Sequence, residues 1–264
     1  MKIQKVANYH EMSVAGAGII YDDLVAALRQ GKHFNLGLAT GNTMIELYQI
    51  LADRLNADGI DLSNLQTWNL DEYAQDEHHA VSHDHPLSYW KYMHEKLFYK
   101  FAPERNFKEG QAHFPDPSDP AKFDRDLEAA GGLDLQLLGI GFNGHIAFNE
   151  PVKESEISVE EYGKLPTRVL PLTKETIIQN TYVTANGDSS LVPRFAATTG
   201  MKPILAAKKE LLLACFAEQE APLNKMLSDG RATPELPASY LLNHHDFTLI
   251  YTADKITCCC NSRG

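Results

Sequence analysis

Positive charge, cysteine and long apolar segments are all scarce in this chain of 264 residues. It has 24 Lys and Arg against 35 Asp and Glu, which gives a formal net charge of -11. Such an acidic balance disfavours binding to nucleic acid or to an anionic membrane surface. No apolar segment reaches the length needed to cross a bilayer, and the N-terminus has no apolar signal core. We therefore expect a cytoplasmic protein that has neither nucleic acid nor a membrane as a partner.

Cysteine is limited to four residues, and neither these nor the histidines have the spacing of a metal site. Cys215 lies in an apolar run, and three consecutive cysteines occupy positions 258–260. Zinc sites use spaced pairs of Cys or His, whereas the four histidines within 78–85 alternate with acidic residues in no regular zinc pattern. The sequence therefore predicts no metal, and we expect residues 256–264 to form a disordered tail.

What the chain does contain is an ordinary globular composition, with 44% hydrophobic and 22% charged residues. Short apolar runs typical of buried strands alternate with segments of helical periodicity. The expected strands include 34–39, 65–70, 165–172, 211–216 and 247–251. The expected helices include 13–30, 44–55, 86–98, 122–130, 173–180, 202–207, 221–227 and 238–243. This alternation, with no internal repeat and no clear linker, predicts one α/β domain over residues 1–255 with a parallel sheet covered on both sides.

The most informative stretch is LDLQLLGIGFNGHIAFNEP at 133–151. An apolar run there breaks into glycines, among them Gly144, which let the backbone turn sharply or approach a ligand. Asn143, His145 and Glu150 follow at the carboxyl end of the expected strand, where ligands bind in open α/β sheets. His145 exchanges a proton near neutral pH, and Glu150 is placed to fix its orientation. The alternative is a glycine-rich turn with a solvated carboxylate.

A second loop follows the expected strand 34–39 and consists of Thr40, Gly41, Asn42 and Thr43. A strand, a glycine-containing turn and a helix in succession aim backbone N–H groups and the positive helix end at an anion, above all phosphate. The alternative is that the two threonines simply cap the helix.

A third group of polar residues comes directly after the expected strand 65–70. Asp71 and Glu72 are adjacent there, and either could be no more than a helix cap. Because this strand ends at the same sheet edge as the His145 loop, one of them is a candidate general base, and Asp71 leaves the strand first. The polar segment between Glu150 and Arg168 is expected to be a mobile lid.

Three blocks in order make the chain resemble the glucosamine-6-phosphate deaminase/isomerase family: LGLATGNT at 36–43, TWNLDEY at 67–73 and LLGIGFNGHIAFNEP at 137–151. Weaker similarity extends over nearly the whole chain. The resemblance implies a Rossmann-like, three-layer αβα sandwich with a mostly parallel sheet. It also implies conversion of an amino-sugar phosphate and water into fructose 6-phosphate and ammonia, with no cofactor. Related 6-phosphogluconolactonases share the fold but diverge after the Gly-His pair.

The family's catalytic residues match four positions of this chain. The resemblance assigns proton transfer between C2 and C1 to Asp71 and ring opening to His145. It assigns the support of the imidazole to Glu150 and Asn143, the latter at a position that is Asp in some members. Backbone amides of residues 41–43 would hold the phosphate.

Two basic residues that the family uses on the phosphate are missing. The expected Arg falls at Thr181 or Tyr182, and the expected Lys falls at Gln219 or Glu220. Losing two charge-assisted hydrogen bonds would weaken binding by about two to four decades. Either the substrate differs or other cations substitute, and the candidates for substitution are Lys202, Arg194 and Arg168.

Several alternatives stay open at the level of the sequence. The LPASYLL segment at 236–242 is equally similar to galactosamine-6-phosphate isomerases. Two alternatives from other classes are a sugar-phosphate sensor and a lactone hydrolase, both of the same fold. Sensors of this kind usually carry an N-terminal helix-turn-helix. The motif GHIAFNEP disfavours a lactone hydrolase. Assembly into a homo-oligomer is also left open.

Overall fold

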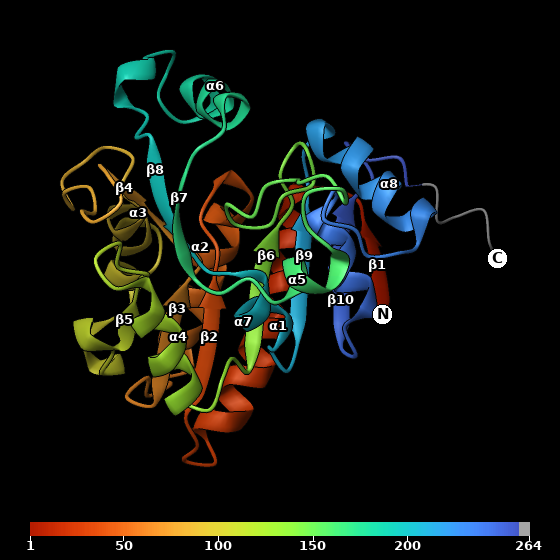
Figure 1. Ribbon diagram of the computed structural model, residues 1–264. Helices are drawn as coiled ribbons and strands as arrows, with labels where there is room; N and C mark the ends of the chain where they lie inside the picture. The colour runs from red at the N-terminus through yellow and green to blue at the C-terminus, as the bar shows by residue number, and fades with distance from the viewer. Residues whose placement is uncertain (259–264) are drawn as a thin grey trace.

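The structure is a computed structural model that describes residues 1–258. Its main element is a seven-stranded sheet in which every neighbouring pair of strands is parallel (Figure 1). Such sheets need apolar strands because helices cover both faces. In spatial order the strands are β1 (Lys2–Val6), β10 (Phe247–Thr252), β9 (Glu210–Ala214), β6 (Leu135–Gly139), β2 (Phe34–Leu38), β3 (Leu65–Asn69) and β5 (Ala112–His113).

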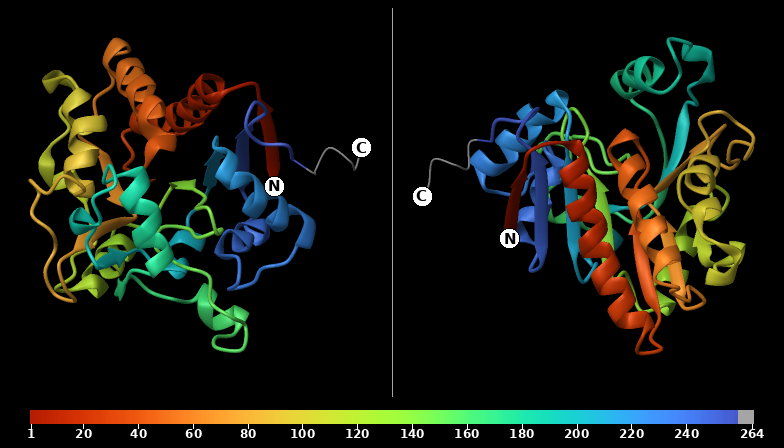
Figure 2. Two further views of the ribbon diagram at one scale, coloured as in Figure 1. Left: turned by 90° about the horizontal axis from the view of Figure 1, so that it is seen from above. Right: turned by 180° about the vertical axis from the view of Figure 1, so that it is seen from behind.

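Helices cover both faces of this sheet and make the three layers expected from the sequence. The helices α1 (Tyr9–Leu28) and α2 (Ile45–Ala57) lie over one face, which is turned toward the viewer in the right-hand view of Figure 2. On the other face, α4 (Pro120–Ala129) packs Phe123 and Leu127 against Trp68 of β3. The remaining helices are α3 (Tyr89–Lys96), α5 (Val159–Gly163), α6 (Lys174–Val183), α7 (Met201–Leu205) and α8 (Glu220–Asp229).

The order of the strands creates a switch point between β2 and β6. From β2 the chain continues to β3 and β5 on one side, and from β6 it continues to β9 and β10 on the other. The loops that follow β2 and β6 therefore diverge at their carboxyl ends and leave a crevice between them, where ligands bind in sheets of this kind.

A second, antiparallel sheet of three strands was not expected from the sequence. It consists of β4 (Asp71–Ala74), β8 (Phe195–Thr198) and β7 (Arg168–Pro171), in that order. Asp71 pairs with Thr198 in its register. In Figure 1, β7 and β8 rise from the body of the molecule to α6, which lies at its top. The small sheet thus places both Asp71 and α6.

Two expectations about irregular segments were wrong. The segment between Glu150 and Arg168 is not a free lid: it contains α5, and Tyr162 there is buried and donates to the carbonyl of Glu150 at 2.8 Å. At the C-terminus, Ile256 and Cys258 are buried in the main core, so packed structure continues past residue 255. The rest of the expected tail, 259–264, lies outside the described residues.

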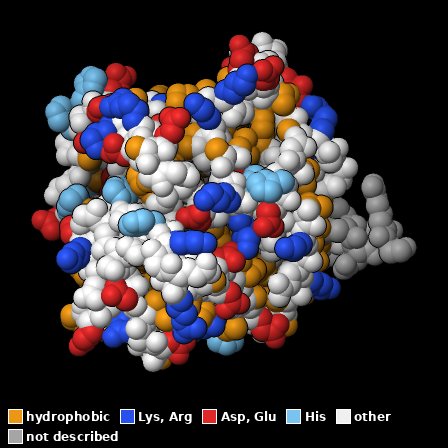
Figure 3. All heavy atoms as spheres, turned by 90° about the horizontal axis from the view of Figure 1, so that it is seen from below, with side chains coloured by type: hydrophobic (Ala, Val, Ile, Leu, Met, Phe, Trp, Pro, Cys, Tyr) orange, Lys and Arg blue, Asp and Glu red, His pale blue; other side chains and the backbone are white. Residues whose placement is uncertain are grey.

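Among residues 1–258 no helix is long and apolar enough to cross a membrane. Figure 3 shows one face of the molecule, on which acidic and basic side chains are interspersed, with no broad field of positive charge.

Candidate active site

A cavity of about 640 Å³ lies at the switch point. Its walls come from the loop after β2, the start of β4, one face of α3, the loop after β6, and α6. Asp71 and His145 both line it, although they arrive from separate strands. The residues that line it and bear on the chemistry are Thr40, Gly41, Asn42, Thr43, Asp71, Tyr89, Tyr92, Lys96, His145, Thr176, Asn180 and Glu218.

Asp71 is a buried carboxylic acid, with only 6% of its surface exposed. Burial, and secondarily the neighbouring charge of Glu72, raise the pKa of Asp71 to about 8. A carboxyl group with such a pKa can both accept and return a proton near neutral pH, which is what proton transfer between adjacent carbons requires.

Glu72 has a structural role. Its carboxylate accepts hydrogen bonds from the backbone N–H groups of Tyr89 (2.9 Å) and Trp90 (2.8 Å) and from the hydroxyl of Ser88 (3.0 Å). These donors belong to the first turn of α3, where backbone N–H groups lack partners within the helix and a negative charge is favourable. Of the two adjacent carboxyl groups, Glu72 therefore fixes α3, and Asp71 faces the cavity.

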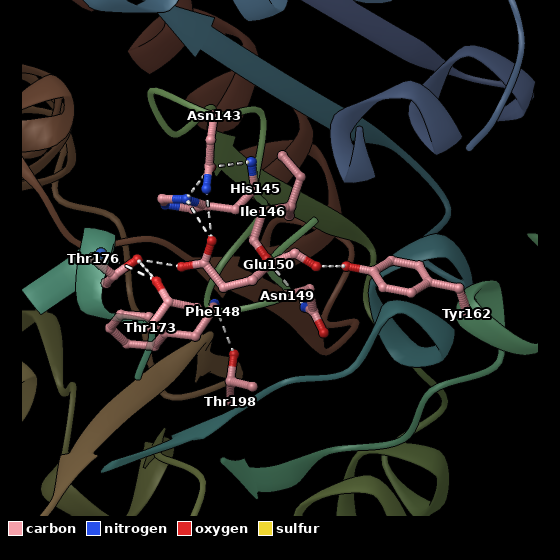
Figure 4. A network of polar contacts seen from close by, with 10 residues as sticks. All are labelled: Asn143, His145, Ile146, Phe148, Asn149, Glu150, Tyr162, Thr173, Thr176 and Thr198. Atoms are coloured by element: carbon pink, nitrogen blue, oxygen red, sulfur yellow. Dashed lines mark hydrogen bonds and ion pairs between the residues drawn. The ribbon is translucent and has the colours of Figure 1, made fainter. Parts of the chain in front are cut away.

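His145 is held by a short chain of polar contacts, drawn in Figure 4. Asn143 donates from its amide nitrogen to the Glu150 carboxylate at 2.8 Å, and its Oδ1 lies 2.7 Å from His145 Nδ1. The Glu150 carboxylate also accepts from the Thr176 hydroxyl of α6 and lies 3.7 Å from His145 Nδ1. Asn143 and Glu150 thus do not line the cavity but orient the residue that does.

The same contacts define the tautomer of His145. Because the Asn143 amide nitrogen donates to Glu150, its oxygen is the atom that faces Nδ1, so Nδ1 carries the proton. The lone pair of the neutral ring is then on Nε2. Burial lowers the pKa of His145, and the Glu150 charge opposes this to a smaller extent. The imidazole is therefore a neutral proton acceptor at neutral pH.

Two glycines shape the loop after β6. A Cβ atom on Gly141 would lie 2.2 Å from His145 Cε1, so the ring position requires glycine there. Gly144 has φ +87°, and a Cβ atom on it would lie 2.2 Å from the Leu236 side chain. Gly144 does not line the cavity, and its positive φ lets the loop turn. Its binding of substrate stays a prediction from the sequence.

The loop Thr40–Thr43 lines the cavity as expected, at the start of a short 3₁₀ helix that leads into α2. Gly41 has φ +108°, a conformation that favours glycine. The hydroxyl of Tyr92 donates to the Gly41 carbonyl at 2.7 Å, and that of Tyr9 donates to the Asn42 carbonyl at 3.0 Å. These contacts satisfy the carbonyls of Gly41 and Asn42 and fix the shape of the loop.

The basic residues expected to replace the missing cations do not line the cavity. Arg168 is turned away, because its Nη1 donates to Asn149 Oδ1 at 2.8 Å. Lys202 and Arg194 are exposed and lie elsewhere on the surface. The binding of phosphate by Lys202 and Arg168 stays a prediction from the sequence, and their positions outside the cavity lining do not favour it.

Two of the positions where cations were missing, Gln219 and Thr181, have internal partners. Gln219 accepts from the Cys215 backbone N–H at 2.7 Å and donates to the Ile140 carbonyl at 2.9 Å, so it joins the ends of β9 and β6. Thr181 donates to the Ile177 carbonyl within α6 at 2.8 Å.

Sequence reasoning missed several residues that line the cavity. Tyr89, Tyr92 and Lys96 recur at i, i+3 and i+7 along α3, so they share one face of that helix. This spacing was visible in the expected helix 86–98 and could have identified that face. Thr176 and Asn180 of α6 had no such signal, because only the second sheet brings α6 to the cavity.

Comparisons with known proteins agree with this geometry. The model of the family described as glucosamine-6-phosphate isomerases/6-phosphogluconolactonase matches residues 7–154. Glucosamine-6-phosphate deaminase 2 of Bacillus subtilis (strain 168) is 38% identical over 95% of this chain and 94% of its own length. Glucosamine-6-phosphate deaminase of Thermoanaerobacter sp. (strain X514) is 37% identical over 95% of this chain and 92% of its own length.

Solved structures extend the comparison. A structure described as a monomeric glucosamine-6-phosphate deaminase is 30% identical, with a TM-score of 0.83 over 97% of this chain and 98% of that one. A 6-phosphogluconolactonase from Thermotoga maritima, at 20% identity, has a TM-score of 0.68 over 95% of this chain and 98% of that one, a similarity of fold.

Proposed function

Because the chain belongs to the family of glucosamine-6-phosphate isomerases and 6-phosphogluconolactonases, we propose that it is a glucosamine-6-phosphate deaminase. The reaction converts glucosamine 6-phosphate and water into fructose 6-phosphate and ammonia. The observation that carries this proposal is that Asp71 and His145 line the same cavity. The full-length relatives named for this activity support the same substrate.

His145 acts first in the proposed mechanism. The pyranose ring opens when the O1 proton is removed and O5 receives a proton. The unprotonated Nε2 of His145 is suited to accept from O1 and then donate to O5. Asn143 and Glu150 keep the ring in this tautomer and stabilise the imidazolium that forms transiently.

Asp71 then carries the isomerisation. Its carboxylate takes the proton from C2 of the open-chain amino sugar and returns it to C1. O1 gains a proton and the amino nitrogen loses one, so the C1 aldehyde becomes an alcohol and C2 becomes an imine. Water adds to the resulting C2 imine, and the carbinolamine collapses to release ammonia and fructose 6-phosphate. A pKa of about 8 allows Asp71 both to accept the proton from C2 and to donate it to C1 near neutral pH.

The substrate phosphate is proposed to lie against the backbone amides of the loop Thr40–Thr43. The 3₁₀ turn from Asn42 to Met44 leads directly into α2, whose positive end supports an anion there. The cytoplasmic location and any assembly into a homo-oligomer stay predictions from the sequence.

One assay tests the proposal. Ammonia release is measured with glucosamine 6-phosphate, galactosamine 6-phosphate and the two unphosphorylated amino sugars, with His145→Ala as the inactive control. Turnover of glucosamine 6-phosphate that His145→Ala abolishes is the expected result. Turnover of galactosamine 6-phosphate alone would show that this epimer, and not glucosamine 6-phosphate, is the substrate. Tight binding of a sugar phosphate without turnover would indicate a sensor.

A further inference from the structure

The cavity has little positive charge for a site that receives a phosphate. Near neutral pH the phosphate group of a sugar phosphate carries a charge of about -1.5 to -2. Of the described residues that line the cavity, Lys96 alone is a Lys or Arg, and Glu218 adds a negative charge. The basic residues weighed from the sequence, Arg168, Lys202 and Arg194, lie elsewhere. Lys96 is therefore the candidate among these residues for a cation that binds the phosphate.

The position of Lys96 suits that role. Tyr92, one turn earlier on the same face of α3, donates its hydroxyl to the Gly41 carbonyl, so this face lies against the loop after β2. Tyr89, on the same face, interacts with both Thr40 and Asp71.

The length of α3 then sets the spacing between the two ends of the site. Seven residues separate Tyr89 from Lys96, which corresponds to about 10 Å along the helix axis. An open-chain hexose with a phosphate on its sixth carbon has a similar length. The substrate can therefore extend from Asp71 along this face of α3, with its phosphate between the loop Thr40–Thr43 and Lys96.

The ammonium group of Lys96 is available for a ligand. Lys96 is half-buried, and within residues 1–258 its side chain has neither an ion pair nor a hydrogen bond. Lys96 is the last residue of α3 and lines the cavity. A lysine at the edge of an apolar surface usually covers that surface with its alkyl stem and keeps its charged end in the polar surroundings.

We propose that Lys96 binds the phosphate of the substrate and takes the place of the two basic residues that the chain lacks. This inference rests on the proposed function and adds the residue that selects phosphorylated over unphosphorylated amino sugars. The amides of the loop Thr40–Thr43 orient the phosphate, and Lys96 neutralises part of its charge through a charge-assisted hydrogen bond.

The test compares the full-length protein with three variants in the ammonia-release assay. Lys96→Gln removes the charge, and Lys96→Arg keeps it. Lys91→Gln is the matched control, because Lys91 is also half-buried on α3 but does not line the cavity. The KM for glucosamine 6-phosphate and the inhibition constant of inorganic phosphate are measured for each protein.

Lys96→Gln is expected to raise both constants about 10- to 100-fold with little change in kcat, since it removes binding common to ground state and transition state. Lys96→Arg and Lys91→Gln are expected to stay close to wild type. The inference is overturned if Lys96→Gln resembles Lys91→Gln, or if its KM rises equally for unphosphorylated glucosamine.

Failure of the proposed function is a separate outcome. If the wild-type protein releases ammonia from none of the sugars, the proposed deaminase activity is contradicted. The binding of inorganic phosphate to wild type and to Lys96→Gln, measured by calorimetry, would then still decide whether Lys96 holds an anion. Equal binding by the two proteins would overturn the role of Lys96.

Discussion

Asp71 and Glu72 are adjacent carboxylic acids in β4, and only Asp71 lines the cavity, while Glu72 accepts hydrogen bonds from the first turn of α3. Successive side chains of a strand point to opposite faces, so Asp71 and Glu72 lie on opposite faces of β4. The negative charge of Glu72 nevertheless acts on its neighbour and helps to raise the pKa of Asp71.

The first prediction concerns the activity of Asp71. Asp71→Asn keeps the size of the side chain but cannot take a proton from C2, so kcat is expected to fall by about 10²- to 10⁴-fold. Steady-state ammonia release measures this, and the far-ultraviolet circular dichroism of the variant checks that it is folded. A folded variant with wild-type kcat would remove Asp71 from the mechanism.

The same substitution is expected to stabilise the protein at neutral pH. The folded-state pKa of Asp71, about 8, exceeds the value of about 3.9 in an unfolded chain. The folded state therefore binds this proton more tightly, and the stability is lost as pH rises from about 4 through 8. Asp71→Asn should unfold at a higher urea concentration than wild type at pH 8, and this difference should shrink toward pH 4. A difference that is the same at both pH values would contradict the raised pKa.

The third prediction concerns pH dependence. If Asp71 acts as its carboxylate, kcat/KM rises with pH through about 8. Glu72→Gln removes a neighbouring negative charge but keeps an acceptor for α3, so the pKa of Asp71 should fall and the rise should move to lower pH. The profile of kcat/KM between pH 5 and 10 measures this shift. An unmoved midpoint would mean that Glu72 does not influence the group that titrates.

A fourth prediction concerns Asn143. Asn143→Asp places a second carboxylate beside His145, which favours the charged imidazolium, so the pKa of His145 should rise. The ring signals of His145 in an NMR titration report this pKa, and His145→Ala identifies them. We expect activity at low pH to decline in parallel. An unchanged or lower pKa would show that the amide of Asn143 is not what keeps the ring neutral.

The fifth prediction compares Gly139, the last residue of β6, with Gly141 in the loop that follows. Gly141→Ala would place a methyl group against the His145 ring, whereas a Cβ atom on Gly139 meets only the Met44 side chain at an ordinary 3.5 Å. Displacing the imidazole should reduce kcat by about 10²-fold in Gly141→Ala. Gly139→Ala, the control, should retain activity. Equal activities of the two variants would indicate that the ring does not need its present position.

The sequence was sufficient to predict the loops that carry the chemistry. Strands 34–39 and 65–70 and the apolar run from Leu133 are short, apolar and followed by glycine or polar residues, so their carboxyl ends could be identified locally. Parallel strands bring such ends to one edge, which is why Asp71 and His145 could be expected together. β1 gave no comparable signal, because it is an edge strand whose first four residues are exposed.

What could not be predicted depends on contacts between distant parts of the chain. The small sheet pairs β4 with β8, more than a hundred residues later, and neither strand indicates its partner. Arg168 is basic and close in sequence to the expected lid, yet it pairs with the buried amide of Asn149. The sequence could suggest Arg168 as a cation for phosphate. Only the folded structure shows that its guanidinium group contacts Asn149.

Thr198 connects the two sides of the cavity. Its backbone is paired with Asp71 in the small sheet, and its hydroxyl accepts from the Phe148 backbone N–H at 3.0 Å in the loop that carries His145. The span between the acid and the imidazole is therefore bridged by a single residue and does not depend on a bound sugar. Because Asp71 and His145 keep their spacing without a ligand, the substrate has to adopt the shape that fits between them. Inhibitors that are held rigidly in the open-chain shape should therefore bind more tightly than flexible ones.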